Sequence, residues 1–129
     1  MDAFPVFMYC SFMHEFSLMA SVMDMVAEEL ARHKARRLTL LRLRYGELDS
    51  IQADSMRFAF EAMTQGTPHE GAVLEMAEDP LVLKCSLCGC SFQPESRSAM
   101  FAPCPACHGQ SAFRVEKGEG IFLDHLEAE

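Results

Sequence analysis

Two pairs of cysteines carry the clearest chemistry in this sequence. Cys85 and Cys88 form one CxxC pair, Cys104 and Cys107 form a second, and fifteen residues separate the pairs. Two residues between cysteines let one turn present both sulfurs to one ion, and two such turns complete the tetrahedron that Zn²⁺ takes with thiolates. Four thiolates leave no open position for water, so the spacing predicts structural Zn²⁺ and no catalysis at that ion.

Two spare candidate ligands, Cys90 and His108, lie beside these pairs. We interpret them as a free thiol and an exposed imidazole, and the sequence leaves their role open. A zinc deaminase would combine the Pro103–Cys107 segment with an upstream HxE motif. The HxE of this chain is residues 125–127, downstream of the cysteines, so that class of enzyme is excluded.

Met13-His14-Glu15 is the second group with metal-binding side chains. A histidine next to a glutamate is common, and taken alone these residues indicate a solvated approach to the first helix.

Hydrophobic periodicity predicts the elements that must position these residues. Apolar residues at helical spacing predict a first helix that is capped by Ser17 and ends near His33. The further predicted elements are a strand over residues 37–45, a helix from its cap Asp54 to Gly66, a strand over residues 72–78 and a strand over residues 121–127.

Between Leu81 and about Phe113 the sequence is rich in Cys, Gly, Pro and Ser and cannot bury much of a core by itself. The predicted fold class is therefore α+β, a small mixed sheet with two helices and an inserted Cys₄ zinc-ribbon-like module. We place the α+β domain at residues 13–80 plus 119–129 and the zinc-binding domain at residues 81–118. Residues 1–12 are an N-terminal extension of doubtful relevance, interpreted as an edge strand, a partner-contacting arm, or sequence before the true start.

Composition limits the partners. The formal net charge of -8 argues against a nucleic-acid binder, because backbone phosphates would be repelled. No stretch is long and apolar enough to span a bilayer, so we expect no membrane partner. Five of the six cysteines are clustered at metal spacing rather than dispersed as in a disulfide framework. We therefore expect a cytoplasmic protein with reduced thiols.

Several segments, taken in order along the chain, resemble one known family. They are residues 13–19, Gly46-Glu47-Leu48, residues 71–75, the two CxxC pairs and residues 121–127. Together they are similar to the HypA/HybF family of nickel-incorporation proteins in [NiFe]-hydrogenase maturation, from Met13 to the end of the chain.

The resemblance implies a nickel metallochaperone without catalytic activity, with Ni²⁺ as the transported ion and Zn²⁺ as the structural one. It implies nickel ligands at Met13, His14 and Glu15, and Ni²⁺ favours such nitrogen-rich sites. The implied partners are a nickel-handling maturation GTPase, the hydrogenase large subunit and, in some organisms, urease maturation factors, with the chain a monomer or weak homodimer. Here Met13 is internal and has no free amine. We favour a start at Met13, because the preceding residues show no packing pattern; removal of the extension or a different ligand set are the alternatives.

Two other classes of function stay open at the level of sequence. A zinc-ribbon protein-interaction module would bind zinc alone and would not need His14. An enzyme with an exchangeable zinc would need water in place of one thiolate.

Overall fold

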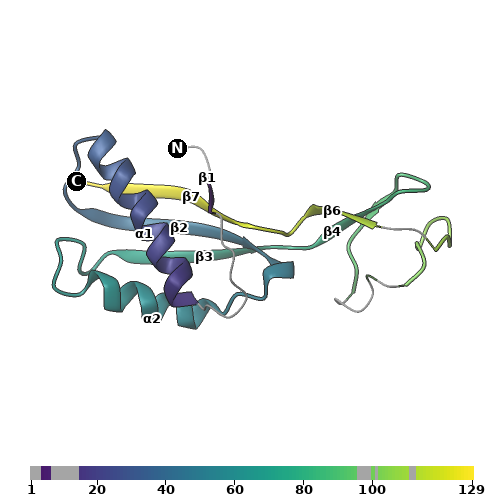
Figure 1. Cartoon of the computed structure of the whole chain (residues 1–129), viewed down its shortest axis with the longest axis horizontal. Helices are drawn as coiled ribbons and strands as arrows, with labels where there is room; N and C mark the ends of the chain where they lie inside the picture. Colours follow the sequence, from purple (N-terminus) through teal and green to yellow (C-terminus); the bar gives the residue numbers. More distant parts are fainter. Residues whose placement is uncertain (1–3, 7–14, 96–99, 101, 111–112) are drawn as a thin grey trace.

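The computed structural model describes residues 4–6, 15–95, 100, 102–110 and 113–129. These residues form a four-stranded sheet with two helices and a smaller three-stranded sheet beside it (Figure 1). In chain order the elements are β1 (Phe4–Val6), α1 (Glu15–Arg32), β2 (Leu38–Gly46), the 3-10 helix η1 (Glu47–Asp49), α2 (Ala53–Thr64), β3 (Val73–Asp79), β4 (Val82–Cys85), β5 (Ser91–Phe92), β6 (Phe113–Lys117) and β7 (Ile121–Ala128).

The two helices begin differently from the prediction. Ser17, expected as a cap, lies inside α1, which starts at Glu15. Asp54, also expected as a cap, lies in the first turn of α2, and Gln52 precedes that helix. Both expected caps were wrong, although an acidic residue in the first turn does suit the positive end of a helix dipole. The predicted helices and strands agree with the observed ones to within three residues at each end.

The larger sheet has the order β1-β7-β2-β3. Strand β2 runs parallel to β3 and antiparallel to β7, so the sheet is mixed and the predicted α+β class is confirmed. One face of β2 is buried because its alternate residues Leu41 and Leu43 point into the core. Apolar residues of both helices pack there, among them Val22 of α1 and Phe60 of α2.

The N-terminal strand β1 pairs antiparallel with β7, with Phe4 opposite Leu123 and Val6 opposite Ile121. Three of the residues before Met13 therefore pair with the sheet as a strand. Of the three interpretations of the extension, an edge strand describes them. Met13 and His14 lie outside the described residues.

The smaller sheet has the antiparallel order β5-β4-β6 and is inserted between β3 and β7. Its buried core is thin and consists mainly of Leu81, Leu83, Cys85 and Cys104. Two neighbouring connections join it to the larger sheet, one from β3 to β4 and one from β6 to β7 (Figure 1). The sheet needs a further source of stability because so little apolar surface is buried.

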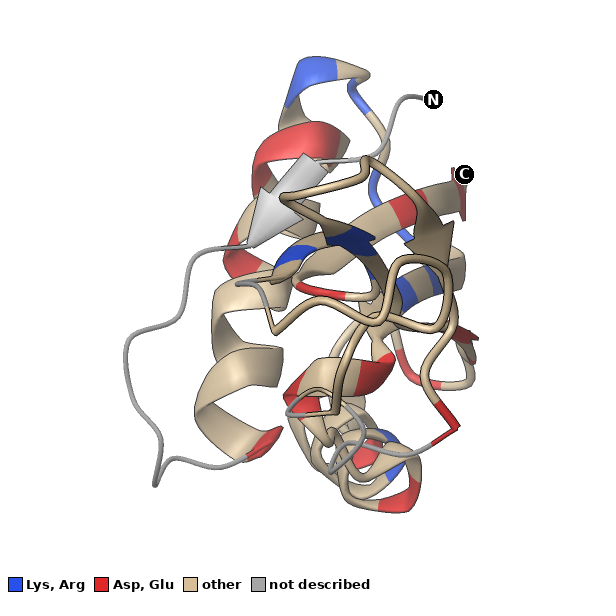
Figure 2. Cartoon of the chain, turned by 90° about the vertical axis from the view of Figure 1, so that its right-hand side faces the viewer, with Lys and Arg blue, Asp and Glu red and all other residues tan. Residues whose placement is uncertain are grey.

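Charged residues of both signs are distributed over the helices and strands (Figure 2). No helix among the described residues is both long and apolar enough to cross a membrane.

Candidate metal centres

The four cysteines of the two CxxC pairs come together in space, with their sulfurs all within 4.8 Å of one another. The distance is 3.9 Å between the sulfurs of Cys85 and Cys107, and 3.7 Å between those of Cys88 and Cys104. A regular tetrahedron with Zn–S bonds of about 2.3 Å has sulfur–sulfur edges of about 3.8 Å. The sulfurs therefore stand at the spacing that a tetrahedral thiolate site requires.

The two turns that carry these cysteines share one backbone pattern. In each turn, the residue after the second cysteine donates its N–H to the carbonyl of the first. Gly89 donates to Cys85 at 3.0 Å, and His108 donates to Cys104 at 2.8 Å. Gly89 and His108 also both have positive φ, at 76° and 60°. His108 thus occupies the left-handed position that glycine fills in the first turn, which the sequence did not indicate.

The thiols of the cluster differ in pKa, partly because backbone amides donate hydrogen bonds to their sulfurs. The N–H groups of Cys107 and Ala106 lie 3.5 and 3.4 Å from the Cys104 sulfur and lower the pKa of that thiol. At Cys88 the N–H of Cys90 acts in the same direction, but burial and the neighbouring thiols outweigh it and raise the pKa of Cys88 to about 12. The Cys104 thiol therefore loses its proton more readily than the Cys88 thiol, and a bound cation would stabilise the negative charge of each thiolate.

Neither spare candidate belongs to this cluster within the described residues. The Cys90 thiol donates to the Ser91 carbonyl at 3.6 Å. The His108 side chain is exposed. The geometry thus brings together the four predicted cysteines and leaves Cys90 and His108 outside.

Of the second candidate group, only Glu15 lies within the described residues. Glu15 is the first residue of α1, and its Oε2 accepts a hydrogen bond from the backbone N–H of Gln52 at 3.1 Å. Because Gln52 directly precedes α2, this carboxylate satisfies a donor at the start of a second helix. No sequence pattern predicts the contact, since 37 positions separate the two residues.

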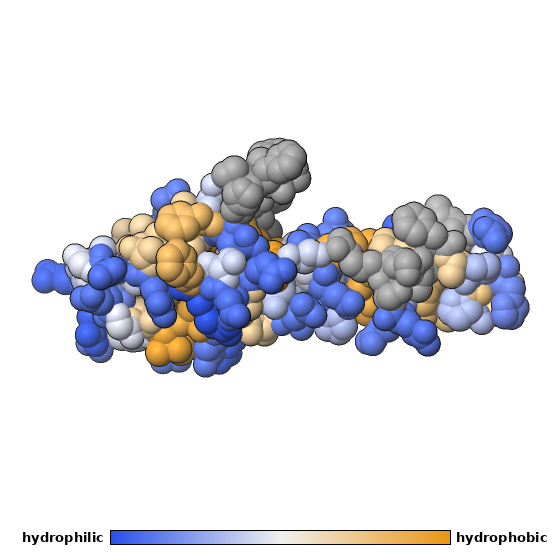
Figure 3. Space-filling view, turned by 90° about the horizontal axis from the view of Figure 1, so that it is seen from below, coloured by the Kyte–Doolittle hydropathy of each residue, from blue (hydrophilic) through white to orange (hydrophobic). Residues whose placement is uncertain are grey.

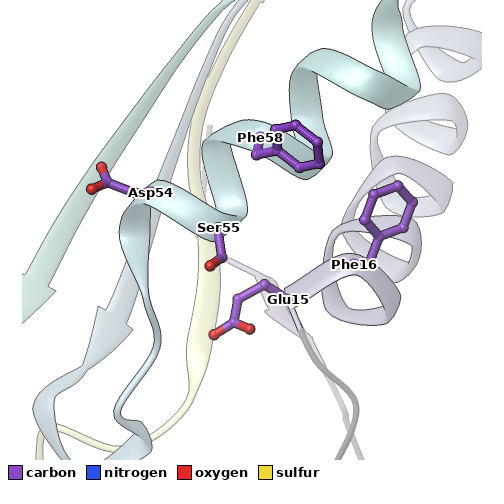
Figure 4. A pocket seen from close by; sticks show the side chains of 5 residues that line it. All are labelled: Glu15, Phe16, Asp54, Ser55 and Phe58. Carbon is purple, nitrogen blue, oxygen red and sulfur yellow. The ribbon is translucent and has the colours of Figure 1, made fainter.

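A pocket of about 480 Å³ opens beside Glu15 and is lined by Glu15, Phe16, Asp54, Ser55 and Phe58. Phe16 and Phe58 stand on neighbouring helices, and Ser55 points toward Glu15 (Figure 4). Both aromatic rings are accessible, with exposed fractions of 48% for Phe16 and 68% for Phe58. Seen from the side of α2, apolar surface lies among hydrophilic residues on the helical half of the molecule (Figure 3).

Comparison with known proteins shows which family this chain is similar to. A family model described as "Hydrogenase/urease nickel incorporation, metallochaperone, hypA" matches residues 13–128. A hydrogenase maturation factor HypA from Lawsonia intracellularis is 40% identical over 118 residues, covering 91% of this chain and 100% of the relative. The one from Solidesulfovibrio magneticus is 35% identical over 117 residues, with the same coverage.

Solved structures show the same fold. The solution structure of the Ni metallochaperone HypA from Helicobacter pylori is similar with a TM-score of 0.64 and 22% identity, covering 90% of this chain and 97% of that one. A second solution structure of a HypA protein has a TM-score of 0.67 and 21% identity, covering 90% and 96%.

Proposed function

The chain belongs to the HypA family of hydrogenase and urease nickel-incorporation metallochaperones, and on that premise we propose that it carries nickel at Met13, His14 and Glu15. The observation that carries the proposal is the family match, which begins at Met13 and continues to residue 128. The imidazole of His14 and nearby backbone nitrogens supply the ligand type that Ni²⁺ prefers.

Glu15 supports this assignment through its position. It follows His14 directly and is held at the start of α1 by its hydrogen bond to Gln52. A carboxylate accepts several hydrogen bonds or cations, so this bond is compatible with a nickel ligand. The exposed rings of Phe16 and Phe58 lie beside it. They offer apolar contact area to a protein that receives or supplies the ion.

We assign structural Zn²⁺ to Cys85, Cys88, Cys104 and Cys107. The sulfur–sulfur spacing supports zinc, and a closed set of four thiolates supports a structural role. We assign nickel binding to residues 13–80 plus 119–129 and zinc binding to residues 81–118.

The proposed partners are a nickel-handling maturation GTPase, the hydrogenase large subunit and urease maturation factors. We propose that the chain transfers the ion without covalent chemistry, as a monomer or weak homodimer. Reduced thiols at the cysteine cluster suit the cytoplasm. The alternative of a zinc-ribbon module without a nickel role is not favoured, because the family match covers both helices and every strand except β1.

Nickel titration of the zinc-loaded chain tests the proposal, with the full chain and a form beginning at Met13 measured in parallel. Each form is compared with a His14→Ala variant and with His33→Ala, a control histidine exposed at the end of α1. We expect one nickel per chain, lost in His14→Ala and kept in His33→Ala, with zinc unchanged throughout. Equal nickel binding by His14→Ala and the unsubstituted chain would assign the ion elsewhere, and no nickel binding by either form would leave the zinc-only alternative.

A further inference from the structure

The Gly46-Glu47-Leu48 segment carries part of the family resemblance but belongs to neither metal centre. Together with Asp49 it lies where the two sheets are joined. The Glu47 carboxylate accepts a hydrogen bond from the Leu81 N–H at 2.9 Å, in the connection from β3 to β4. The Asp49 carboxylate accepts one from the Gly120 N–H at 2.7 Å, in the connection from β6 to β7. Two acidic side chains, two positions apart in the sequence, thus accept hydrogen bonds from both connections.

Backbone contacts reinforce these bonds. The Gly46 N–H donates to the Gly120 carbonyl at 2.9 Å, and the Leu48 N–H donates to the Gly118 carbonyl at 3.0 Å. The approach is so close that a Cβ built on Gly46 would lie 2.0 Å from the Gly118 oxygen, and one on Gly118 would lie 2.5 Å from the Leu81 Cα. Three stretches of backbone therefore meet at a point that only glycine permits.

The same segment reaches the start of α1. Gln52 follows η1 closely and donates its N–H to the Glu15 carboxylate. An unbroken stretch from Gly46 to Gln52 is thus bonded at one end to both connections of the smaller sheet and at the other to the residue that begins α1.

We propose that residues 46–52 form a clasp in which Glu47 and Asp49 are positioning residues that fix the direction of the three-stranded sheet relative to the helices. Two short connections alone would allow the smaller sheet to swing as a hinged body. Acceptors on both connections remove that freedom, because swinging would break bonds at two separate points. The proposal goes beyond nickel binding and does not depend on it.

Orientation of the two sheets in the zinc-loaded full chain is the direct test, measured by residual dipolar couplings of backbone amides. In the unsubstituted protein, couplings from β2, β3 and β7 and from β4 and β6 should fit one common alignment. In a Glu47→Ala/Asp49→Ala variant the couplings of the two sheets should require two separate alignments. The couplings in the three-stranded sheet should also be smaller.

Matched variants separate a hydrogen-bond role from loss of charge. Glu47→Gln and Asp49→Asn keep an acceptor oxygen, so each should keep the common alignment. Glu119→Ala is the control, because this acidic residue lies in the β6–β7 connection and its side chain makes no hydrogen bond or ion pair within the described residues. It should behave as the unsubstituted chain does. A common alignment kept by the double alanine variant would overturn the clasp.

Hydrogen exchange gives a second test that needs no double variant. The amides of Leu81 and Gly120 have side-chain acceptors, so both should exchange slowly in the unsubstituted protein. Glu47→Ala should lower protection about tenfold at Leu81, and Asp49→Ala should do so at Gly120, each leaving the other amide protected. Exchange of both amides at the rate of an exposed amide in the unsubstituted chain would equally refute the clasp. Neither test uses nickel, so a failed nickel titration and a failed clasp are distinguishable.

Discussion

The Glu15 carboxylate accepts the backbone N–H of Gln52 and so joins the first residue of α1 to the residue that precedes α2. This contact joins Glu15, the last of the three proposed nickel ligands, to the start of α2. The two residues are held together by this hydrogen bond even though 37 positions separate them in the sequence.

Loss of this contact should be measurable without any nickel. We expect Glu15→Ala to lower the free energy of unfolding by up to about 1 kcal/mol, because an N-terminal donor of α2 loses its acceptor at a partly exposed site. Glu15→Gln keeps an acceptor and should stay close to the unsubstituted chain. Urea unfolding of the zinc-loaded protein, followed by circular dichroism, measures both. Identical midpoints for Glu15→Ala and the unsubstituted chain would restrict Glu15 to a role in metal binding.

Zinc content should distinguish the cysteines of the cluster from the spare one. Cys104 is fully buried and is the thiol whose pKa the backbone amides lower. We expect the zinc content of Cys104→Ala to fall from one ion per chain to near zero after dialysis, because three thiolates hold the ion far less tightly than four. Cys90→Ala should keep one zinc, since its sulfur lies outside the cluster. Elemental analysis measures the zinc content of each variant. Loss of zinc from Cys90→Ala would show that the Cys90 thiol is also a ligand.

Zinc removal should unfold one sheet and spare the other. Few residues are buried around β4, β5 and β6, whereas the helices and the larger sheet share an extensive apolar core. With a strong chelator we expect amide resonances of residues 82–117 to collapse toward random-coil positions while those of α1, α2 and β2 keep their dispersion. Readdition of zinc should restore the spectrum. Simultaneous loss of both sheets would mean that the ion stabilises the whole chain.

Ionisation of Tyr45 at alkaline pH should lower the free energy of unfolding. Burial raises the pKa of this phenol, and the carboxylate of Glu78 on the neighbouring strand raises it further. Below about pH 10 the phenol is neutral in both the folded and the unfolded state, so its contribution to stability is fully present. As the pH rises from there through the folded-state pKa, the unfolded state ionises first and stability falls.

A Tyr45→Phe variant should therefore lose less stability than the unsubstituted chain between pH 9 and about pH 11. Urea midpoints at several pH values measure the difference in slope. A Tyr9→Phe variant measures the contribution of the other tyrosine of the chain. Parallel slopes for Tyr45→Phe and the unsubstituted protein would show that Tyr45 does not titrate differently on folding.

Periodicity and spacing predicted those parts of the molecule that local sequence determines. The strands around Leu41, Leu74 and Leu123 and the two helices follow from apolar faces that one core must bury. The Cys₄ cluster follows from two CxxC pairs, because each turn already sets the geometry of two sulfurs.

Contacts between distant segments were not predictable in this way. The carboxylates of Glu15, Glu47 and Asp49 accept hydrogen bonds from backbone N–H groups that are 37, 34 and 71 positions away in the sequence. No local pattern encodes such a partner. The short strands β4 to β6 contain too few apolar residues for alternation to stand out. The edge strand β1 was only one of three interpretations of the N-terminal residues, because a strand of three residues carries no measurable period.

The entry and exit of the inserted sheet touch each other, since a Cβ on Gly118 would lie 2.5 Å from the Leu81 Cα. Because the two ends of the insertion meet, we expect that a tight turn can replace residues 82–117 without displacing the strands on either side. By the same reasoning we expect a fluorescent or affinity module inserted between residues 81 and 118 to leave the two helices and the larger sheet folded.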